Sequence, residues 1–350
     1  MTADAVGGVW CYALELARAL APIHFVIATM GPPPSADQRR EAAAIANLTL
    51  EESSFRLEWM EDPWADVADA AEWLLALEQI HQPDLIHLNG YCHAALPWRA
   101  PCLVAAHSCV LSWWQAAKGG DAPASWDRYA VEVRSGIAAA AHVVAPTHDM
   151  LRCIRHHYEA PRQASVIPNG RHTKPRPQAK HARILSAGRI WDEGKNIATL
   201  VQAAKGLEWP VDLAGEAAEA GHFPNVRFLG RLPAEEMQRH LDAAAIYAAP
   251  ALYEPFGLAI LEAAQAGCAL VLSDIPSLRE LWDSAACFVS PRDPAAWHAA
   301  LSHLIGNGTF RAHLARAARY RARRYRTGPM QRAYHDLYSE LLAAPLAVTS

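Results

Sequence analysis

In the stretch Tyr253-Glu254-Pro255-Phe256-Gly257-Leu258-Ala259-Ile260-Leu261-Glu262-Ala263, two carboxylates stand eight positions apart. The apolar residues 245–250 before it predict a strand and its loop, and the alanine-rich run after Gly257 predicts a helix. Glu254 would then lie in a loop at the carboxyl end of a strand, and Glu262 in the second turn of the helix. The first N–H groups of that helix, around residues 256–259, have no partner within the helix. The stretch therefore predicts an anion site flanked by two acids, which suits a phosphorylated sugar.

The bulk properties of the chain exclude several classes of protein. Its 350 residues exceed one ordinary core, so two domains are expected. With 52% hydrophobic and 19% charged residues the chain is globular, and a net charge of -4 gives the whole protein no attraction to nucleic acid. It has no run of 18 apolar residues and no signal-peptide pattern, and its seven cysteines form no C-x-x-C pair. We therefore expect a protein of the reducing cytoplasm without a membrane span, a disulfide framework or a zinc site.

Short apolar strands alternate with helices along both halves of the chain. In the first half we expect strands at residues 24–29, 55–59, 84–88, 102–106, 142–145 and 164–167. In the second half we expect them at residues 183–187, 210–214, 226–229, 245–248, 269–272 and 287–289. Helices are expected at residues 8–21, 36–45, 66–80 and 126–140, and a loop rich in tryptophan and glycine at residues 111–124. Such alternation is typical of parallel, doubly wound sheets.

The polar segment 171–180, which contains two prolines, predicts a linker. We therefore expect an α/β protein with two Rossmann-like domains of doubly wound parallel sheet, residues 1–172 and 173–327, facing a central cleft. The remaining segment, 328–350, contains a final helix at about residues 330–342. Before it, residues 311–326 carry seven arginines, which fit either a solvated helix face or contact with anionic lipid or a polyanionic acceptor.

Two cations flank a turn directly after a predicted strand, in Gly188-Arg189-Ile190-Trp191-Asp192-Glu193-Gly194-Lys195-Asn196. Arginine offers a phosphate a bidentate fork and lysine a point charge, so Arg189 and Lys195 are candidates for binding phosphate. The alternative is a surface loop in which Glu193 pairs with Lys195. For the acidic pair the alternative is two surface residues, but Glu262 lies in an apolar segment. A carboxylate there needs a partner, which ribose hydroxyls would supply.

Two further candidates lie in the first half. His107 follows the strand predicted at residues 102–106. There it can donate to a sugar hydroxyl or a phosphate, or serve as a hydrogen-bonded structural histidine. Gly7-Gly8 suits either backbone approach to a phosphate or a plain turn. The remaining histidines have no neighbouring Cys or carboxylate at metal-ligand spacing, so no metal site is expected.

Together these motifs resemble the GT-B glycosyltransferases of the large retaining group called family 4 or group 1. The E-x7-E pair from Glu254 to Glu262 carries the resemblance most specifically. The resemblance covers nearly the whole chain and is strongest over residues 164–290. The other motifs that carry it are Gly188-Arg189…Lys195, Ala214-Gly215-Glu216, Phe228-Leu229-Gly230-Arg231-Leu232, Val166-Ile167-Pro168-Asn169-Gly170 and Val6-Gly7-Gly8-Val9.

The resemblance implies that the C-terminal domain binds a nucleoside-diphosphate sugar, with UDP, GDP and ADP all open as the nucleotide. Arg189 and Lys195, in the turn that begins at Gly188, would neutralise the diphosphate. Gly8 would approach the diphosphate from the N-terminal domain. The nucleotide base would lie against the segments around Gly215 and Leu232.

The same resemblance assigns the rest of the donor. Glu262 would accept hydrogen bonds from the ribose, and His107 would contact the donor sugar near its reacting carbon. The final helix would cross back onto the N-terminal domain. The hydroxyls of the transferred sugar would be held by the carboxylate of Glu254 and by the backbone N–H groups of Phe256, Gly257 and Leu258.

In this group the anomeric configuration is retained, and no cofactor besides the donor is implied. The expected reaction is metal-independent transfer of a hexosyl group to a glycan or another hydroxyl acceptor, either free or lipid-linked. The expected location is the cytoplasm or the inner face of the membrane. Two alternatives stay open: another GT-B enzyme such as a sugar-nucleotide epimerase, and a non-catalytic protein that binds nucleotide sugars or glycans.

The chain departs from the family pattern at two points. Lys195 follows Arg189 by one residue more than is most common, which predicts a widened turn. The family also places a full strand before the Gly-Gly turn, whereas only residues 1–4 remain for that strand here. We expect upstream in-frame codons to encode several apolar residues, because a shortened central strand would leave backbone groups of its neighbours unpaired.

Overall fold

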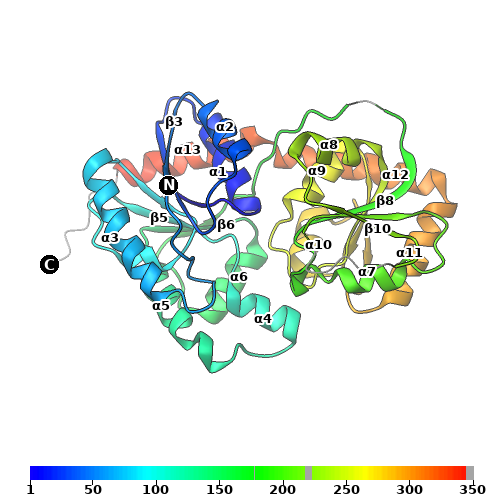
Figure 1. Cartoon of the computed structure of the whole chain (residues 1–350), viewed down its shortest axis with the longest axis horizontal. Helices are drawn as coiled ribbons and strands as arrows, with labels where there is room; N and C mark the ends of the chain where they lie inside the picture. The colour runs from blue at the N-terminus through cyan, green and yellow to red at the C-terminus, as the bar shows by residue number, and fades with distance from the viewer. Residues whose placement is uncertain (177, 217–222, 344–350) are drawn as a thin grey trace. The chain divides into compact units, whose positions relative to one another are not determined.

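The chain is divided into two compact units. The computed structural model describes residues 1–176, 178–216 and 223–343 (Figure 1). The N-terminal unit comprises residues 1–114 and 120–170 and the segment from Thr327 onward, and the C-terminal unit comprises residues 115–119 and 171–326. The linker expected at residues 171–180 contains neither helix nor strand where it is described, and Pro177 lies outside the described residues.

The N-terminal unit is built on two parallel sheets. Their strands, in the order in which they pair, are β1 (Thr2–Asp4), β2 (Phe25–Met30) and β3 (Leu48–Glu52), and β4 (Ile86–Leu88), β5 (Cys102–Ala105), β6 (His142–Ala145) and β7 (Ala164–Val166). The side chain of Asn89 connects the sheets where β1 adjoins β4, because its Nδ2 donates to the carbonyl oxygen of Thr2 at 2.7 Å. The backbone N–H of Asn89 also donates to Thr2 Oγ1 at 2.9 Å. In place of one continuous backbone ladder, a side chain therefore joins the short first strand to β4.

Helices cover both faces of these sheets. Those of the N-terminal unit are α1 (Gly8–Ala19), α2 (Ala36–Ala43), α3 (Trp64–His81), α5 (Asp127–Ala139), α6 (His148–His157) and α13 (Thr327–Ala343). A further helix, α4 (Val110–Lys118), begins in this unit, and its residues 115–118 belong to the C-terminal unit. Successive strand residues point to opposite faces. Leu103 and Val144 accordingly join the core formed with α1 and α13. Val104 and Val143 join the core formed with α5 and α6.

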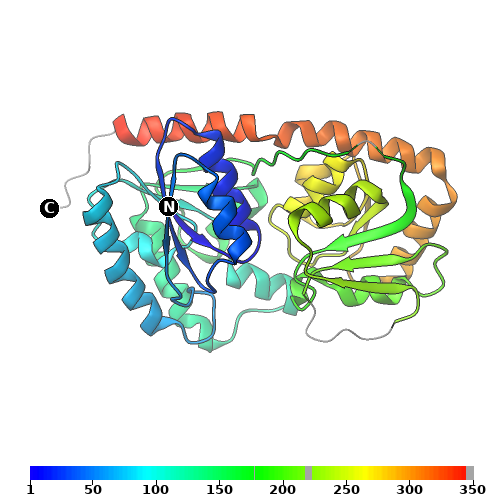
Figure 2. The same ribbon diagram turned by 45° about the horizontal axis from the view of Figure 1, so that its top comes forward.

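The last helix, α13, belongs to the N-terminal unit. It lies beside α1, as Figure 2 shows with α13 in red. Its residues Met330, Tyr334 and Leu337 are buried in the same core as Leu14 of α1. The final helix thus packs in the core of the N-terminal unit.

Two of the sequence predictions for this unit are wrong. The strand expected at residues 55–59 lies instead at Leu48–Glu52, as β3. Phe55 and Leu57 alternate as strand residues do, but they pack against α3 from an irregular segment. The loop expected at residues 111–124 is helical throughout its first half, where α4 spans Val110–Lys118. The other predicted strands are present to within two residues at either end.

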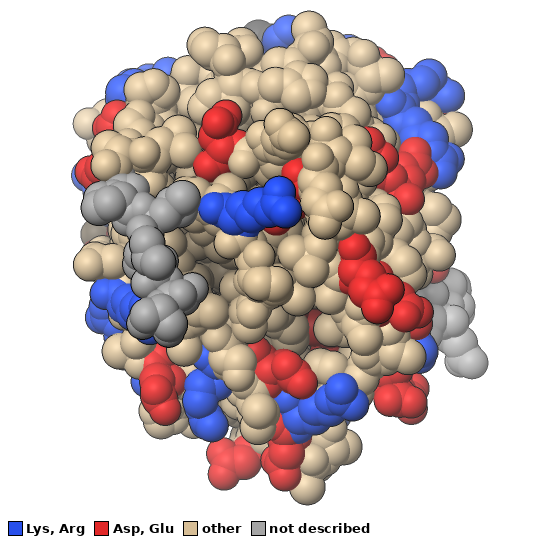
Figure 3. Space-filling model, turned by 90° about the vertical axis from the view of Figure 1, so that its left-hand side faces the viewer, with Lys and Arg blue, Asp and Glu red and all other residues tan. Residues whose placement is uncertain are grey.

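Charged side chains of both signs are interspersed on the face of the molecule that Figure 3 shows, as suits the net charge of -4. Two of the seven arginines in residues 311–326 donate to backbone carbonyl oxygens, and a third, Arg323, lies over the ring of Tyr320. Arg311 Nη1 donates to the carbonyl oxygen of Ile305 at 3.0 Å. Arg321 Nη2 donates to that of Asp283 at 2.6 Å. The exposed arginines of this segment are 316, 319, 323, 324 and 326.

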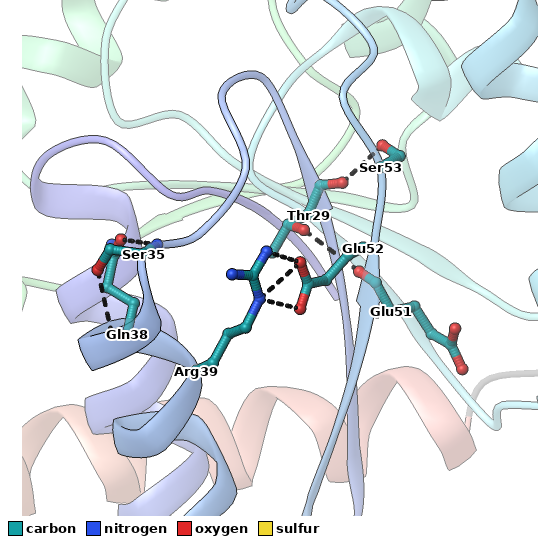
Figure 4. A network of polar contacts seen from close by, with 7 residues as sticks. All are labelled: Thr29, Ser35, Gln38, Arg39, Glu51, Glu52 and Ser53. Atoms are coloured by element: carbon teal, nitrogen blue, oxygen red, sulfur yellow. Dashed lines mark hydrogen bonds and ion pairs between the residues drawn. The ribbon is translucent and has the colours of Figure 1, made fainter.

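Polar contacts fix α2 against the edge strand β3 (Figure 4). Arg39 of α2 forms a two-pronged ion pair with Glu52, with Nε and Nη2 at 2.8 and 2.7 Å from the carboxylate oxygens. Hydrogen bonding to Arg39 lowers the pKa of the Glu52 carboxyl. At its N-terminus α2 has a capping box, in which the side chains of Ser35 and Gln38 each accept a hydrogen bond from the backbone N–H of the other residue. α2 therefore covers the edge of the sheet at β3.

The C-terminal unit contains one six-stranded parallel sheet. Its strands pair in the order β10 (Val226–Gly230), β9 (Val211–Ala214), β8 (His181–Ala187), β11 (Ala244–Ala249), β12 (Ala269–Ser273) and β13 (Cys287–Val289). The order reverses direction between β8 and β11. In doubly wound sheets, ligands bind beyond the carboxyl ends of the strands at such a switch point. The expected Rossmann-like α/β architecture is confirmed.

Alternate residues of this sheet face two different cores. Leu185 and Tyr247 face the core with α8 (Ala234–Ala243), α9 (Leu258–Ala266) and α10 (Pro276–Trp282), which α12 (Gly308–Arg321) also joins. Ile184 and Ile246 face the core with α7 (Ile197–Ala203) and α11 (Pro294–Gly306). Among the described residues, no helix is both long and apolar enough to cross a membrane.

Candidate functional site

The two loops that leave β8 and β11 at the switch point are tied together. Backbone N–H groups of Leu252 and Tyr253 both donate to the carbonyl oxygen of Gly194, at 2.8 and 3.2 Å. Asn196 Nδ2 donates to the carbonyl oxygens of Pro250 and Pro291, at 2.8 and 2.7 Å. The segment with the two predicted cations and the segment with the first predicted acid therefore form one structural unit.

Lys195 and Glu254 form an ion pair in this unit. Lys195 Nζ donates to Glu254 Oε2 at 2.5 Å, and both side chains are largely buried. Glu254 lies in the loop between β11 and α9, as predicted. Its backbone carbonyl is held by Ser277, whose Oγ donates to it at 2.7 Å. The partner of Lys195 is thus the acid of the E-x7-E pair, and not the neighbouring Glu193.

Arg189 lies in the same loop, with a carboxylate of its own. Its Nη2 donates to Asp192 Oδ2 at 2.9 Å, and 42% of the arginine side chain is exposed. Asp192 is buried, and its other oxygen accepts the backbone N–H of Gly194 at 2.9 Å. The extra length between Arg189 and Lys195 contains a short 3-10 helix, Glu193–Lys195, which Asp192 caps. The sequence predicted a widened turn but did not identify Asp192 as the residue that shapes it.

Glycines with positive φ follow three neighbouring strands of the sheet. Gly188 follows β8, Gly215 follows β9 and Gly230 ends β10, with φ of 154, 145 and 68 degrees. A Cβ on Gly215 would lie 1.8 Å from the carbonyl oxygen of Gly188. The backbone turns can therefore approach each other only because side chains are absent. Leu232, the other residue expected near the base, lies half-buried between β10 and α8.

Gly257 opens helix α9. It precedes the helix in the left-handed region, with φ 84 degrees, and supplies no side-chain cap. A Cβ there would lie 2.8 Å from Ile260 Cδ1 and 3.2 Å from Glu254 Cγ. The helix begins at Leu258, so its first N–H groups lie next to the Glu254 loop, with Phe256 buried behind them. This is the arrangement that binds anions at helix N-termini.

Glu262 lies in the second turn of α9, as predicted, but its partner is a residue that the sequence reasoning missed. Arg171 Nε donates to Glu262 Oε1 at 2.8 Å, and 18% of each side chain is exposed. The carbonyl oxygen of Arg171 in turn accepts Gln265 Nε2 at 2.8 Å. The two residues are 91 positions apart, so no local pattern could have paired them.

His107 and Gly8, the candidates of the N-terminal unit, lie at the carboxyl ends of β5 and β1. His107 Nε2 is 2.8 Å from Asn89 Oδ1, and burial lowers the pKa of the imidazole to about 4. Gly7 precedes α1 with φ 95 degrees, and a Cβ on it would meet no atom within 4 Å. Gly8 is the exposed first residue of α1. A backbone approach is therefore sterically open at this turn.

Positive and negative charges balance at the switch point of the C-terminal unit. Lys195 and Arg189 are each paired with one carboxylate, and the first N–H groups of α9 have no partner within the helix. Within the ranges that the structure describes, no three His, Cys, Asp or Glu side chains gather as metal ligands would. The arrangement can exchange carboxylate oxygens for phosphate oxygens around two cations beside a helix N-terminus.

The architecture defines a class of protein. The chain is structurally similar to sucrose-phosphate synthase from Thermosynechococcus elongatus, with a TM-score of 0.81 and 18% identity, over 97% of this chain and 95% of that one. It is also similar to HepE of Anabaena in complex with UDP-glucose, with a TM-score of 0.76 and 17% identity, over 96% of both chains. The fold is that of the GT-B glycosyltransferases.

Sequence comparison gives the family. The family model described as glycosyl transferases group 1 matches residues 181–307, and the one described as glycosyltransferase family 4 matches residues 6–174. The chain belongs to the group 1, or family 4, glycosyltransferases.

Curated relatives match over part of their length. D-inositol 3-phosphate glycosyltransferase of Salinispora tropica is 32% identical over 143 residues, which are 40% of this chain and 30% of that protein. Glycogen synthase of Mycobacterium tuberculosis is 33% identical over 165 residues, 42% of this chain and 39% of that protein. The matched region thus spans between 30% and 39% of the length of these relatives.

Proposed function

We propose that this protein transfers a hexosyl group from a nucleoside-diphosphate sugar to a hydroxyl acceptor, with retention of the anomeric configuration. The observation that carries the proposal is the Lys195–Glu254 ion pair beside the N-terminus of α9, at the switch point of the sheet. A cation for phosphate and a carboxylate for sugar hydroxyls are in direct contact there. Membership of the glycosyltransferase family supports the same activity.

The diphosphate would bind between the two cations and the first turn of α9. Arg189 is 42% exposed, so phosphate oxygens can reach its guanidinium. The buried Asp192 carboxylate would then keep the backbone N–H of Gly194 as its partner. When the bond between the anomeric carbon and the phosphate oxygen breaks, negative charge develops on the diphosphate. Arg189, Lys195 and the helix N–H groups are already placed to stabilise it, and the scheme includes no metal.

The transferred sugar would lie against Glu254. Its Oε2 is bonded to Lys195, which leaves Oε1 for a sugar hydroxyl. The ribose would bind Glu262 through the oxygen that Arg171 does not hold. For retention, the acceptor oxygen attacks the anomeric carbon from the face that the diphosphate leaves. A phosphate oxygen of the leaving group takes the acceptor proton, so no carboxylate nucleophile is needed.

A UDP-sugar is the donor to test first, because a structural neighbour was crystallised with UDP-glucose. The names of the relatives point to inositol phosphate and glycogen, so we propose a polyol or sugar hydroxyl as the acceptor. A lipid-linked acceptor at the inner membrane face is the second possibility. The exposed arginines of residues 316–326 support it, since they could contact anionic headgroups.

The test combines binding with turnover. Thermal unfolding is measured with UDP-, GDP- and ADP-glucose, because a bound donor raises the melting temperature according to its affinity. The stabilising donor is then incubated with a panel of sugar and polyol acceptors, and the anomeric proton of the product is followed by NMR. A product with the donor's configuration supports the proposal. Binding without hydrolysis or transfer would support the non-catalytic alternative, and an inverted product would refute retention.

A further inference from the structure

The hydrogen-bond partner of His107 determines which of its ring nitrogens carries the proton. His107 Nε2 lies 2.8 Å from Asn89 Oδ1. An amide side chain has one donor end and one acceptor end, so its orientation decides what the imidazole must offer. Asn89 has a second fixed contact, and that contact settles the orientation.

The other end of the Asn89 amide faces the carbonyl oxygen of Thr2, at 2.7 Å. A backbone carbonyl oxygen can only accept, so the nitrogen of the amide must point toward Thr2. The oxygen of the amide therefore points toward His107 and must receive a proton. The neutral imidazole that satisfies both contacts carries its hydrogen on Nε2 and a lone pair on Nδ1.

Nδ1 has no hydrogen-bond partner among the described residues, and His107 is half-buried. The aromatic groups packed around the ring are uncharged near pH 7. The ring of Tyr12 from α1 lies edge-on to it, with centroids 4.5 Å apart, and His87 of β4 is itself buried and neutral near pH 7. Beyond Tyr12 lie the phenols of Tyr334 and Tyr338 on α13, whose pKa values burial raises. Burial accordingly lowers the pKa of His107 to about 4.

We propose that Asn89 is a positioning residue for sugar transfer: it holds His107 as the Nε2–H tautomer, so that Nδ1 accepts a hydrogen bond from a hydroxyl group of the substrate. The inference rests on the proposed function. It also narrows that function, because a lone pair on Nδ1 repels phosphate oxygens and attracts hydroxyl hydrogens. Of the two ligands that the sequence left open for His107, the sugar hydroxyl is the one that fits.

A purely structural role for Asn89 is the competing explanation, since the same side chain joins β1 to β4. The variants Asn89→Ala and Thr2→Val separate the two roles. Asn89→Ala removes both the link to Thr2 and the acceptor for His107. Thr2→Val removes only the hydroxyl that accepts the Asn89 backbone N–H, and keeps the carbonyl that orients the amide. Thr2→Val is therefore the matched control for damage to the junction.

The first measurement is nitrogen NMR of the full chain labelled with ¹⁵N-histidine, without substrate, with His107→Gln used to assign the signals. The wild type and Thr2→Val should show a protonated Nε2 and an unprotonated Nδ1 on His107 at pH 7. Asn89→Ala should shift the signals toward a mixture of tautomers. A wild-type Nδ1–H tautomer, or a spectrum that Asn89→Ala leaves unchanged, would overturn the inference whether or not the protein is a glycosyltransferase.

The second measurement is kcat/KM for the donor and acceptor found above. Asn89→Ala should lower it by about tenfold, the worth of one oriented hydrogen bond, and Thr2→Val should change it less than twofold. Asn89→Asp places a carboxylate beside Nε2, which stabilises the imidazolium and should move the acidic limb of the pH–rate profile upward by at least one pH unit. An unshifted limb in Asn89→Asp, or equal losses in Asn89→Ala and Thr2→Val, would assign Asn89 to the junction alone.

Discussion

Glu262 and Arg171 join helix α9 to the first residue of the linker, with Oε1 and Nε 2.8 Å apart. The pair is shielded from solvent, since only 18% of each side chain is exposed. One carboxylate oxygen is thereby held by the arginine. The carboxylate expected to bind ribose is held in place before any donor arrives.

We expect Glu262→Ala to raise the Kd for the nucleotide sugar by about tenfold to a hundredfold, the range for hydrogen bonds to a charged group. Arg171→Ala should raise the same Kd by less, because the carboxylate remains but loses its orientation. Isothermal titration calorimetry measures both. Thr173→Val is the control. Thr173 lies in the same linker as Arg171, and its hydroxyl donates a hydrogen bond to Gln265 rather than to Glu262. Unchanged affinity in Glu262→Ala would remove this residue from the donor site.

Arg189→Ala should lower kcat by about a hundredfold to a thousandfold while changing the donor Kd by less, because the charge that it stabilises develops as the diphosphate leaves. Single-turnover kinetics with saturating donor separate the rate from the binding. Arg239→Ala, which removes an exposed arginine on α8, should behave as the wild type. Should the loss fall wholly on Kd, Arg189 would be a binding residue without a role in bond cleavage.

Gly215→Ala should destabilise the protein by more than about 3 kcal/mol, because its Cβ would lie 1.8 Å from a backbone oxygen that no rotamer change can move. Gly230→Ala meets no atom within 4 Å and should cost only about 1–2 kcal/mol for its left-handed φ of 68 degrees. Gly306→Ala, which meets no atom and ends α11, should be neutral or slightly stabilising. Urea unfolding followed by circular dichroism gives the three values, and a different ranking would show that the backbone contact relaxes.

Buried His87 should make the protein less stable as the pH falls below about 6.5. Its ring nitrogens contact Tyr338 and Tyr12, and burial lowers its pKa well below 6.5. Between the two pKa values the unfolded chain binds a proton that the folded chain does not. Stability is therefore full above pH 6.5 and falls by up to about 1.4 kcal/mol per pH unit below it.

The variant His87→Gln tests this sign. Its free energy of unfolding should fall by about 1.4 kcal/mol less than that of the wild type between pH 7.5 and pH 5.5. His335→Gln, which removes an exposed histidine, should follow the wild type. The comparison is needed because burial also lowers the pKa values of His107 and His142, which act in the same direction. A His87→Gln curve parallel to that of the wild type would contradict the assignment.

The sequence predicted the elements whose signals are local. The E-x7-E stretch placed Glu254 in a loop and Glu262 in the second turn of a helix, and both positions are confirmed. It failed where a local pattern competed with packing. Phe55 and Leu57 alternate like a strand, yet β3 is the less apolar run Leu48–Glu52, which pairs with β2.

The contacts that shape the candidate site were beyond local patterns. Arg171 reaches Glu262 across 91 positions, and Asn89 reaches His107 across 18 positions from a neighbouring strand. In neither pair does the residue type or the local sequence indicate the contact. Only the tertiary fold makes them neighbours, so a sequence can nominate the carboxylate or the imidazole but not the residue that orients it.

The placement of α13 has a consequence for how the chain is made. His87 Nδ1 lies 2.6 Å from the hydroxyl of Tyr338, 251 positions later. During synthesis the first half leaves the ribosome long before the helix that completes its core. Until then, Leu14 and its neighbours on α1 lack part of their cover. The N-terminal unit should therefore finish folding last although it is made first, and nascent chains that end at residue 326 should recruit chaperones that the full-length protein no longer needs.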